Sequence, residues 1–74
     1  MSVIKRSVKI AGHATSITLE AAFWDVLKDI AVKRGTSVSA LIAEIDEERS
    51  AKQETNLSSA IRVYILKTLL QNPL

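Results

Sequence analysis

The chain has 74 residues, of which 47% are hydrophobic, so it can form one domain with a thin core. It contains no Cys and a single His, which excludes disulfides, thiolate–metal sites and His-cluster metal sites. We therefore expect no metal and no cofactor, and oligomerisation remains as a way to support a small core. The net charge of +2 alone says little about partners.

The first segment, residues 1–14, is basic and contains no acidic residue. Residues 7–10 alternate polar and apolar side chains, which is typical of a strand. Two interpretations remain open: a flexible basic arm, or a strand that flanks the next element. In either form the segment can contact the phosphates of a nucleic acid. The candidates for contacts to the DNA backbone are Lys5, Arg6, Lys9 and His13.

Residues 15–19 predict a β-strand, because polar and apolar side chains alternate and most are β-branched. A single strand leaves a row of unpaired backbone N–H and C=O groups. Its partner must come from residues 1–12 of the same chain or from a second copy of the protein.

An intrachain hairpin closed by residues 11–14 is consistent with the apolar pattern. Ile10 would then lie opposite Thr15, and Val8 opposite Ile17, so that the apolar faces coincide. The polar face of this hairpin would combine Lys5, Ser7 and Lys9 with Ser16 and Thr18.

Two helices are predicted after the strand. A helical period runs from Glu20 to Arg34, and Gly35 then suits a left-handed helix end. Ser37 is a good N-cap for the second helix, which we expect to end at about Glu48. The apolar positions of the two helices are Phe23, Val26, Leu27, Ile30, Ala31, Val38, Leu41, Ile42 and Ile45.

A polar connector, residues 49–55, precedes a C-terminal helix, residues 56–74, which Asn56 caps. This helix is apolar on two sides, so we expect both sides to be buried. A second subunit would bury the side that the rest of its own chain does not. The first stripe contains Leu57, Ile61, Tyr64, Ile65 and Leu69; the second contains Val63, Leu66 and Leu70. No apolar stretch reaches the ~20 residues of a membrane span, so no membrane partner is expected.

The stretch Thr15-Ser-Ile-Thr-Leu-Glu through Arg34-Gly-Thr-Ser-Val-Ser-Ala-Leu-Ile resembles the ribbon-helix-helix family of bacterial DNA-binding proteins. The flanking residues Ala22-Phe-Trp and Asn56-Leu-Ser-Ser-Ala-Ile-Arg resemble a short subfamily with an added third helix. The resemblance implies a mainly α fold with one short strand per chain and a core over residues 15–48. It also implies a homodimer whose two strands form an antiparallel β-ribbon.

The resemblance further implies how DNA is held. The polar side of the ribbon would enter the major groove of double-stranded DNA, with base-reading positions at Ala14, Ser16 and Thr18. The start of the second helix would hold a phosphate through Ser37, Val38 and Ser39. The dimer core would contain Ile17, Leu19, Phe23, Trp24, Leu27, Ile30, Val38, Leu41, Ile42, Ile45, Ile61 and Ile65.

The sequence therefore predicts a dimeric DNA-binding transcriptional regulator, such as a repressor, in the cytoplasm at the nucleoid. No catalytic constellation stands out, so we expect no enzyme activity. One alternative is a protein-interaction module, such as an antitoxin or adaptor, that uses the C-terminal helix and the acidic stretch Glu44–Glu48. Another is a DNA-packaging protein with weak sequence preference, because the three base-reading side chains are chemically plain.

Overall fold

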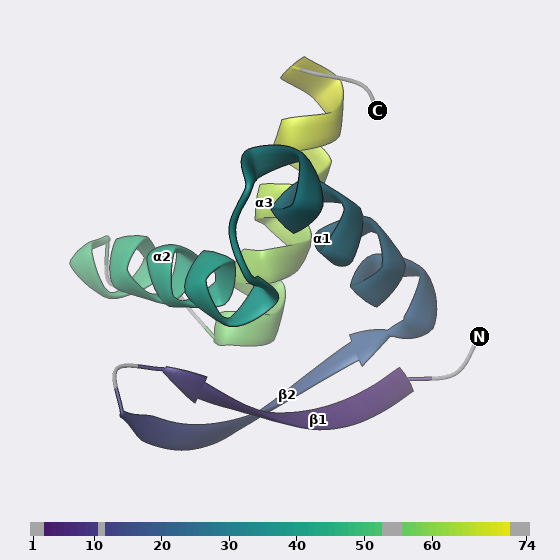
Figure 1. Ribbon diagram of the computed structural model, residues 1–74. Helices are drawn as coiled ribbons and strands as arrows, with labels where there is room; N and C mark the ends of the chain where they lie inside the picture. Colours follow the sequence, from purple (N-terminus) through teal and green to yellow (C-terminus); the bar gives the residue numbers. More distant parts are fainter. Residues whose placement is uncertain (1–2, 11, 53–55, 72–74) are drawn as a thin grey trace.

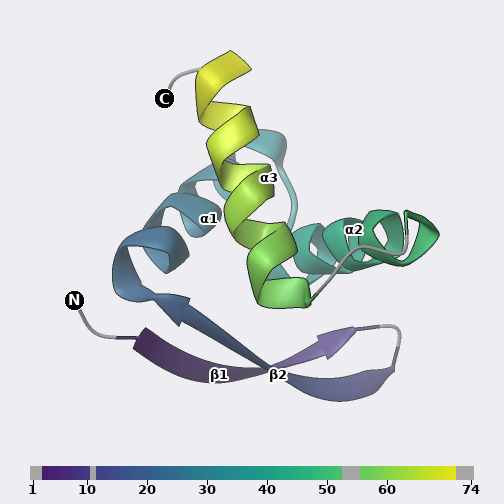
Figure 2. The same ribbon diagram turned by 180° about the vertical axis from the view of Figure 1, so that it is seen from behind.

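A computed structural model describes residues 3–10, 12–52 and 56–71 of the chain. The elements follow in the order β1 (Val3–Ile10), β2 (His13–Glu20), α1 (Ala21–Arg34), α2 (Val38–Ala51) and α3 (Leu57–Gln71). The strands form an antiparallel hairpin, and all three helices lie on one side of it (Figures 1 and 2). Within these ranges, no helix has the length and apolarity that crossing a membrane requires.

Of the two interpretations of the N-terminal segment, a flexible arm or a strand, the structure shows the strand. β1 pairs with β2 in the register Ile10↔His13, Val8↔Thr15 and Arg6↔Ile17. The expected register of Val8 opposite Ile17 is wrong by two residues, because β2 begins at His13 and the turn is shorter than expected. Gly12 at this turn has φ 82°, a left-handed conformation that favours glycine.

The prediction of one short strand per chain is also wrong, since the described residues contain two strands of eight residues each. The physical reason is local. A short turn brings the two strands together at a small cost in loop-closure entropy, and no second chain is needed to supply the partner. The face of the hairpin that carries Val8, Ile10, Ile17 and Leu19 packs against the helices.

The ends of the helices follow the predicted caps. Gly35 adopts the left-handed conformation with φ 69°, and its N–H donates to the carbonyl of Val32. The Ser37 hydroxyl accepts the N–H of Ala40 at 3.0 Å and so caps α2. α2 continues to Ala51 instead of ending at about Glu48. Residues 53–55 of the expected connector lie outside the described residues.

The core is built from both strands and all three helices of one chain. Of the residues expected in a dimer core, Phe23 and Val38 are partly buried, and the others are buried together in a single cluster. α3 completes this cluster with Ile61 and Ile65. Its opposite side is open, because Val63, Leu66 and Leu70 are 43%, 57% and 74% exposed.

Candidate nucleic-acid interface

The hairpin has a polar outer face on the side away from the helices. The register pairs Lys5 with Thr18, Ser7 with Ser16, and Lys9 with Ala14. Because side chains alternate along a strand, all of these point to the same side, and each is exposed. We call this surface the outer face; it consists of Lys5, Ser7, Lys9, Ala14, Ser16 and Thr18.

The chemistry of the outer face is positive and hydrogen-bonding. Two ammonium groups, of Lys5 and Lys9, stand on one strand, and hydroxyls stand on both strands. None of the six residues carries a carboxylate. A two-stranded ribbon of this kind is narrow enough to enter the major groove of B-DNA, where lysines can reach phosphates and hydroxyls can reach base edges.

Arg6 and His13 lie on the other side of the hairpin. Arg6 stands between Lys5 and Ser7 in the sequence, but its guanidinium lies over the indole ring of Trp24, 5.2 Å from the ring centroid. His13 lines a surface pocket with Asp46 and Arg49 of α2. The four side chains predicted to contact the DNA backbone are therefore divided between the two sides of the hairpin.

The start of α2 keeps donors that its cap does not use. The carbonyl of Ser37 accepts the N–H of Leu41, and its hydroxyl accepts the N–H of Ala40. Among the described residues, the N–H groups of Val38 and Ser39 donate to no protein acceptor. First-turn N–H groups of this kind, at the positive end of the helix dipole, can bind a phosphate oxygen.

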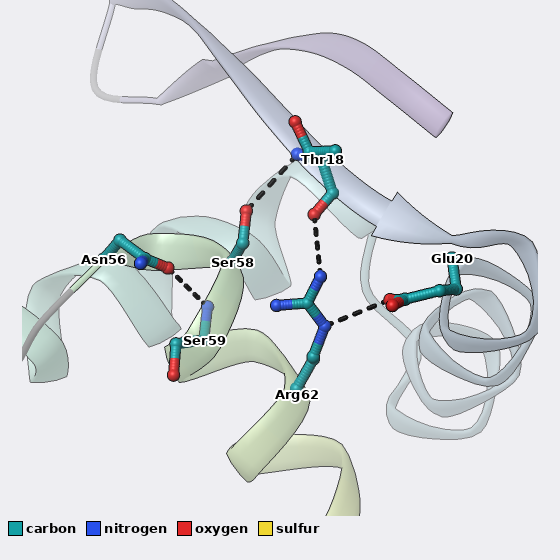
Figure 3. Close-up of polar contacts among 6 residues, drawn as sticks. All are labelled: Thr18, Glu20, Asn56, Ser58, Ser59 and Arg62. Atoms are coloured by element: carbon teal, nitrogen blue, oxygen red, sulfur yellow. Dashed lines mark hydrogen bonds and ion pairs between the residues drawn. The ribbon is translucent and has the colours of Figure 1, made fainter. Parts of the chain in front are cut away.

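The first turn of α3 lies against the edge of β2 that faces away from β1 (Figure 3). The N–H of Thr18 donates to the Ser58 hydroxyl at 3.3 Å. Arg62 donates from Nη2 to the Thr18 carbonyl at 3.4 Å and from Nε to the Glu20 carboxylate at 3.1 Å. We call this pair of side chains, Ser58 and Arg62, the α3 latch.

The surroundings hold the α3 latch in place. Asn56 accepts the N–H of Ser59 through Oδ1 at 2.8 Å and so fixes the start of α3. The Arg62 guanidinium also lies over the Phe23 ring, 5.8 Å from its centroid. A hydrogen bond from the backbone N–H of Glu20, followed by the Arg62 guanidinium, lowers the pKa of the Glu20 carboxyl below its ordinary value of 4.5.

Sequence reasoning missed the α3 latch for a clear reason. Arg62 and Glu20 are separated by 42 positions, and no local pattern links an arginine in one helix to a strand that distant. The sequence did contain a pattern that places Lys5 and Lys9 beside Ser16 and Thr18, namely the alternation of residues 7–10. The register of the hairpin confirms this interpretation.

Over residues 3–69, the sequence matches the family model described as the ribbon-helix-helix domain. The chain belongs to the ribbon-helix-helix family, which confirms the predicted class with its C-terminal helix and supports, at the level of the family, a DNA-binding regulator.

The chain is also similar to a solved structure, that of an uncharacterized protein from Bordetella pertussis Tohama I. The sequence identity is 41% and the TM-score is 0.79. The match covers 93% of this chain, and it spans 57% of the length of that protein's chain. No curated protein matches the sequence.

Proposed function

We propose that this protein is a DNA-binding transcriptional regulator whose outer face enters the major groove of double-stranded DNA. The observation that carries the proposal is the register of the hairpin. It brings two lysines of β1 beside the hydroxyls of β2 on a surface that no helix covers. The membership of the chain in the ribbon-helix-helix family supports, at the level of the family, a DNA-binding regulator.

The residues of the outer face divide into two roles. Lys5 and Lys9 supply affinity through phosphate contacts, which are independent of sequence. Ser7, Ser16 and Thr18 supply sequence preference through base edges, although hydroxyls discriminate poorly between bases. We therefore propose modest sequence preference on top of strong dependence on salt.

The start of α2 and a second copy of the chain complete the proposal. The N–H groups of Val38 and Ser39 would hold a phosphate, as the first turns of helices commonly do. Two copies that join their hairpins side by side would present a wider sheet and two phosphate sites, which would match a two-fold symmetric operator.

A salt titration of DNA binding, followed by fluorescence anisotropy on a labelled duplex, tests the proposal. Each phosphate contact contributes about 0.9 to the slope of log affinity against log salt. We expect Lys5→Ala and Lys9→Ala each to reduce this slope by about 0.9 and to weaken binding to every duplex alike. Ser16→Ala should instead change the preference between duplexes.

Arg6→Ala is the matched control. It removes the same unit of charge from the same strand, but from the side that faces the helices, where Arg6 lies over Trp24. The slope of log affinity against log salt for Arg6→Ala should be closer to the wild-type slope than the slopes of Lys5→Ala and Lys9→Ala are. A folded wild-type protein that binds no duplex at low salt would refute the proposed function, and equal slopes for all three variants would refute the assignment to the outer face.

A second candidate function rests on α3. Its outward stripe of Val63, Leu66 and Leu70 is large, apolar and exposed, which is a feature of protein-interaction surfaces. In this proposal the protein is an adaptor or antitoxin module. Affinity purification from the native cell should then recover a protein that the Leu66→Glu variant loses, and recovery of the same proteins by both would count against this function.

A further inference from the structure

A groove lies between the second half of α2 and α3, and it shares no residue with the outer face. Its volume is about 250 Å³. The apolar part of its lining is Ile45 of α2 with Ala60 and Val63 of α3. α3 borders the groove from Ala60 to Gln71, which corresponds to about 16 Å of helix axis. The groove is therefore long enough to hold several turns of another helix.

Arg34, at the end of α1, connects the two helices that form the groove. Its Nη2 donates to the Glu44 carboxylate of α2 at 3.1 Å, and its Nη1 donates to the Tyr64 hydroxyl of α3 at 3.0 Å. These two contacts hold α2 and α3 in one arrangement. The groove is therefore present in the single chain, and binding of a partner does not first have to order its two walls.

The groove continues into the outward stripe of α3. Val63 belongs to both, and Leu66 and Leu70 extend the apolar surface along the helix. The other large apolar side chains that the structure describes as exposed, Val3 and Val32, lie on β1 and α1. The exposed apolar surface is therefore concentrated on α3, beside the groove, which is typical of contact with another macromolecule.

The charge around this surface is positive. α3 contains Arg62 and Lys67 and no acidic residue. Among the residues that line the groove, Arg49, Lys52 and Lys67 are cationic, whereas the single carboxylate, of Glu48, pairs with Lys52 at 3.0 Å. Lys67 is exposed, and no ion pair within the described ranges involves it. A complementary partner therefore carries carboxylates beside its apolar residues.

A second copy of this chain and DNA both complement this surface poorly. Two α3 helices packed stripe to stripe would bring Lys67 of both chains together without a carboxylate on either helix. α2 of a second copy is acidic, but its large apolar side chains lie in its own core. DNA offers phosphates without an apolar surface, and the C-terminal half of α3 points away from the hairpin (Figures 1 and 2). A different protein is therefore the partner that fits.

We propose that the groove between α2 and α3 binds an acidic amphipathic helix of a different protein. Apolar residues at every third or fourth position of the partner helix pack on Ala60 and Val63, and its carboxylates lie beside Lys67. The inference goes beyond DNA binding, and it rests on the second candidate function only in taking α3 as a protein-binding helix. It adds the place, the secondary structure and the charge of the partner.

Two designed peptides that differ only in charge test the proposal. Both are alanine-based helices of about 15 residues with leucines at every third or fourth position. One carries Glu beside the leucines, and the other carries Lys at the same positions. Isothermal titration calorimetry with the full chain should show that the Glu peptide binds about tenfold more tightly than the Lys peptide. Equal affinities of the two peptides, or no binding of the Glu peptide, would overturn the proposal.

Charge reversal tests whether the peptide occupies the groove. Lys67→Glu should weaken binding of the Glu peptide about tenfold and strengthen binding of the Lys peptide. Lys28→Glu is the matched control, because Lys28 is exposed on α1, does not line the groove, and gives the same change in net charge. Val63→Ala should weaken both peptides roughly fivefold, since it removes apolar contact. Equal effects of the two charge reversals would mean that net charge alone attracts the peptide, and would refute the site.

The outcomes separate this proposal from DNA binding. Lys5→Ala leaves the groove intact, so it should bind the Glu peptide as the wild type does although its DNA binding is weaker. A chain that binds DNA but not the Glu peptide would refute the groove alone, and one that binds the peptide but no duplex would refute DNA binding alone. Self-association that Val63→Ala weakens, without binding of the Glu peptide, would assign the surface to a second copy and overturn the proposal.

Discussion

Replacing Ile61 with Ala tests whether one chain closes its own core. Ile61 lies at the centre of the buried side of α3 and is 0% exposed. The substitution removes most of a buried side chain and leaves a cavity among residues of α3 and its neighbours, without touching the outer face or the α3 latch. The matched control is Val63→Ala on the opposite side of the same helix, where Val63 is 43% exposed.

The expected loss of stability follows from the burial of the Ile61 side chain. Truncation of a fully buried Ile to Ala costs about 2–5 kcal/mol, because transfer and cavity terms add. A 74-residue domain has a total free energy of unfolding of about 4–11 kcal/mol at roughly 0.05–0.15 kcal/mol per residue. Ile61→Ala should therefore remove a large share of the stability. A loss of about 3 kcal/mol corresponds to a drop of roughly 12–24 °C in Tm for a domain of this size.

Urea titration, followed by the fluorescence of Trp24 and by circular dichroism, measures the effect. Trp24 is buried in the same cluster and is the single Trp of the chain, so it reports on the core directly. Val63→Ala should change the free energy of unfolding by no more than about 0.5 kcal/mol. Equal effects of the two substitutions would refute the reasoning, because they would mean that α3 does not dock on its own chain.

Two further predictions concern a backbone conformation and a titrating group. Gly35→Ala should cost about 1 kcal/mol in urea titration, because φ 69° is strained for a residue with a Cβ even though no atom lies within 4 Å of that position. Glu20 has a lowered pKa, so its ion pair contributes stability above its ordinary value of 4.5 that is lost as pH falls through the lowered value. The Tm advantage of the wild type over Glu20→Gln should therefore be present at neutral pH and disappear at strongly acidic pH; an advantage that persists there would contradict the assignment.

The features that the sequence predicts well are those that one residue and its neighbours decide. Gly35, Ser37 and Asn56 each mark a helix end, because the cap is a local choice of conformation and hydrogen bond. The same holds for the buried side of α1, which follows from a helical period. The alternation along residues 7–10 indicated a strand as one of two interpretations, and the structure shows that strand as part of β1.

The register of the hairpin and the contacts of α3 depend on distant pairs. The apolar alternation is satisfied equally by Val8 opposite Thr15 or opposite Ile17, since a shift of two residues keeps every side chain on its face. The length of the turn decides between these registers. Arg6 illustrates the same limit: its charge suggests a phosphate contact, whereas its place opposite Ile17 directs it towards Trp24.

The docking of α3 changes what a second copy can contribute. A chain with only one strand and two helices would need a partner to bury its apolar residues, so its dimerisation would be obligatory. Here Ile61 and Ile65 already complete the core. The contacts of Ile61 and Ile65 with this core come from the same chain, so α3 buries the apolar residues without a second copy. The loss of stability in Ile61→Ala should therefore be a property of one chain, and it should be the same at every protein concentration.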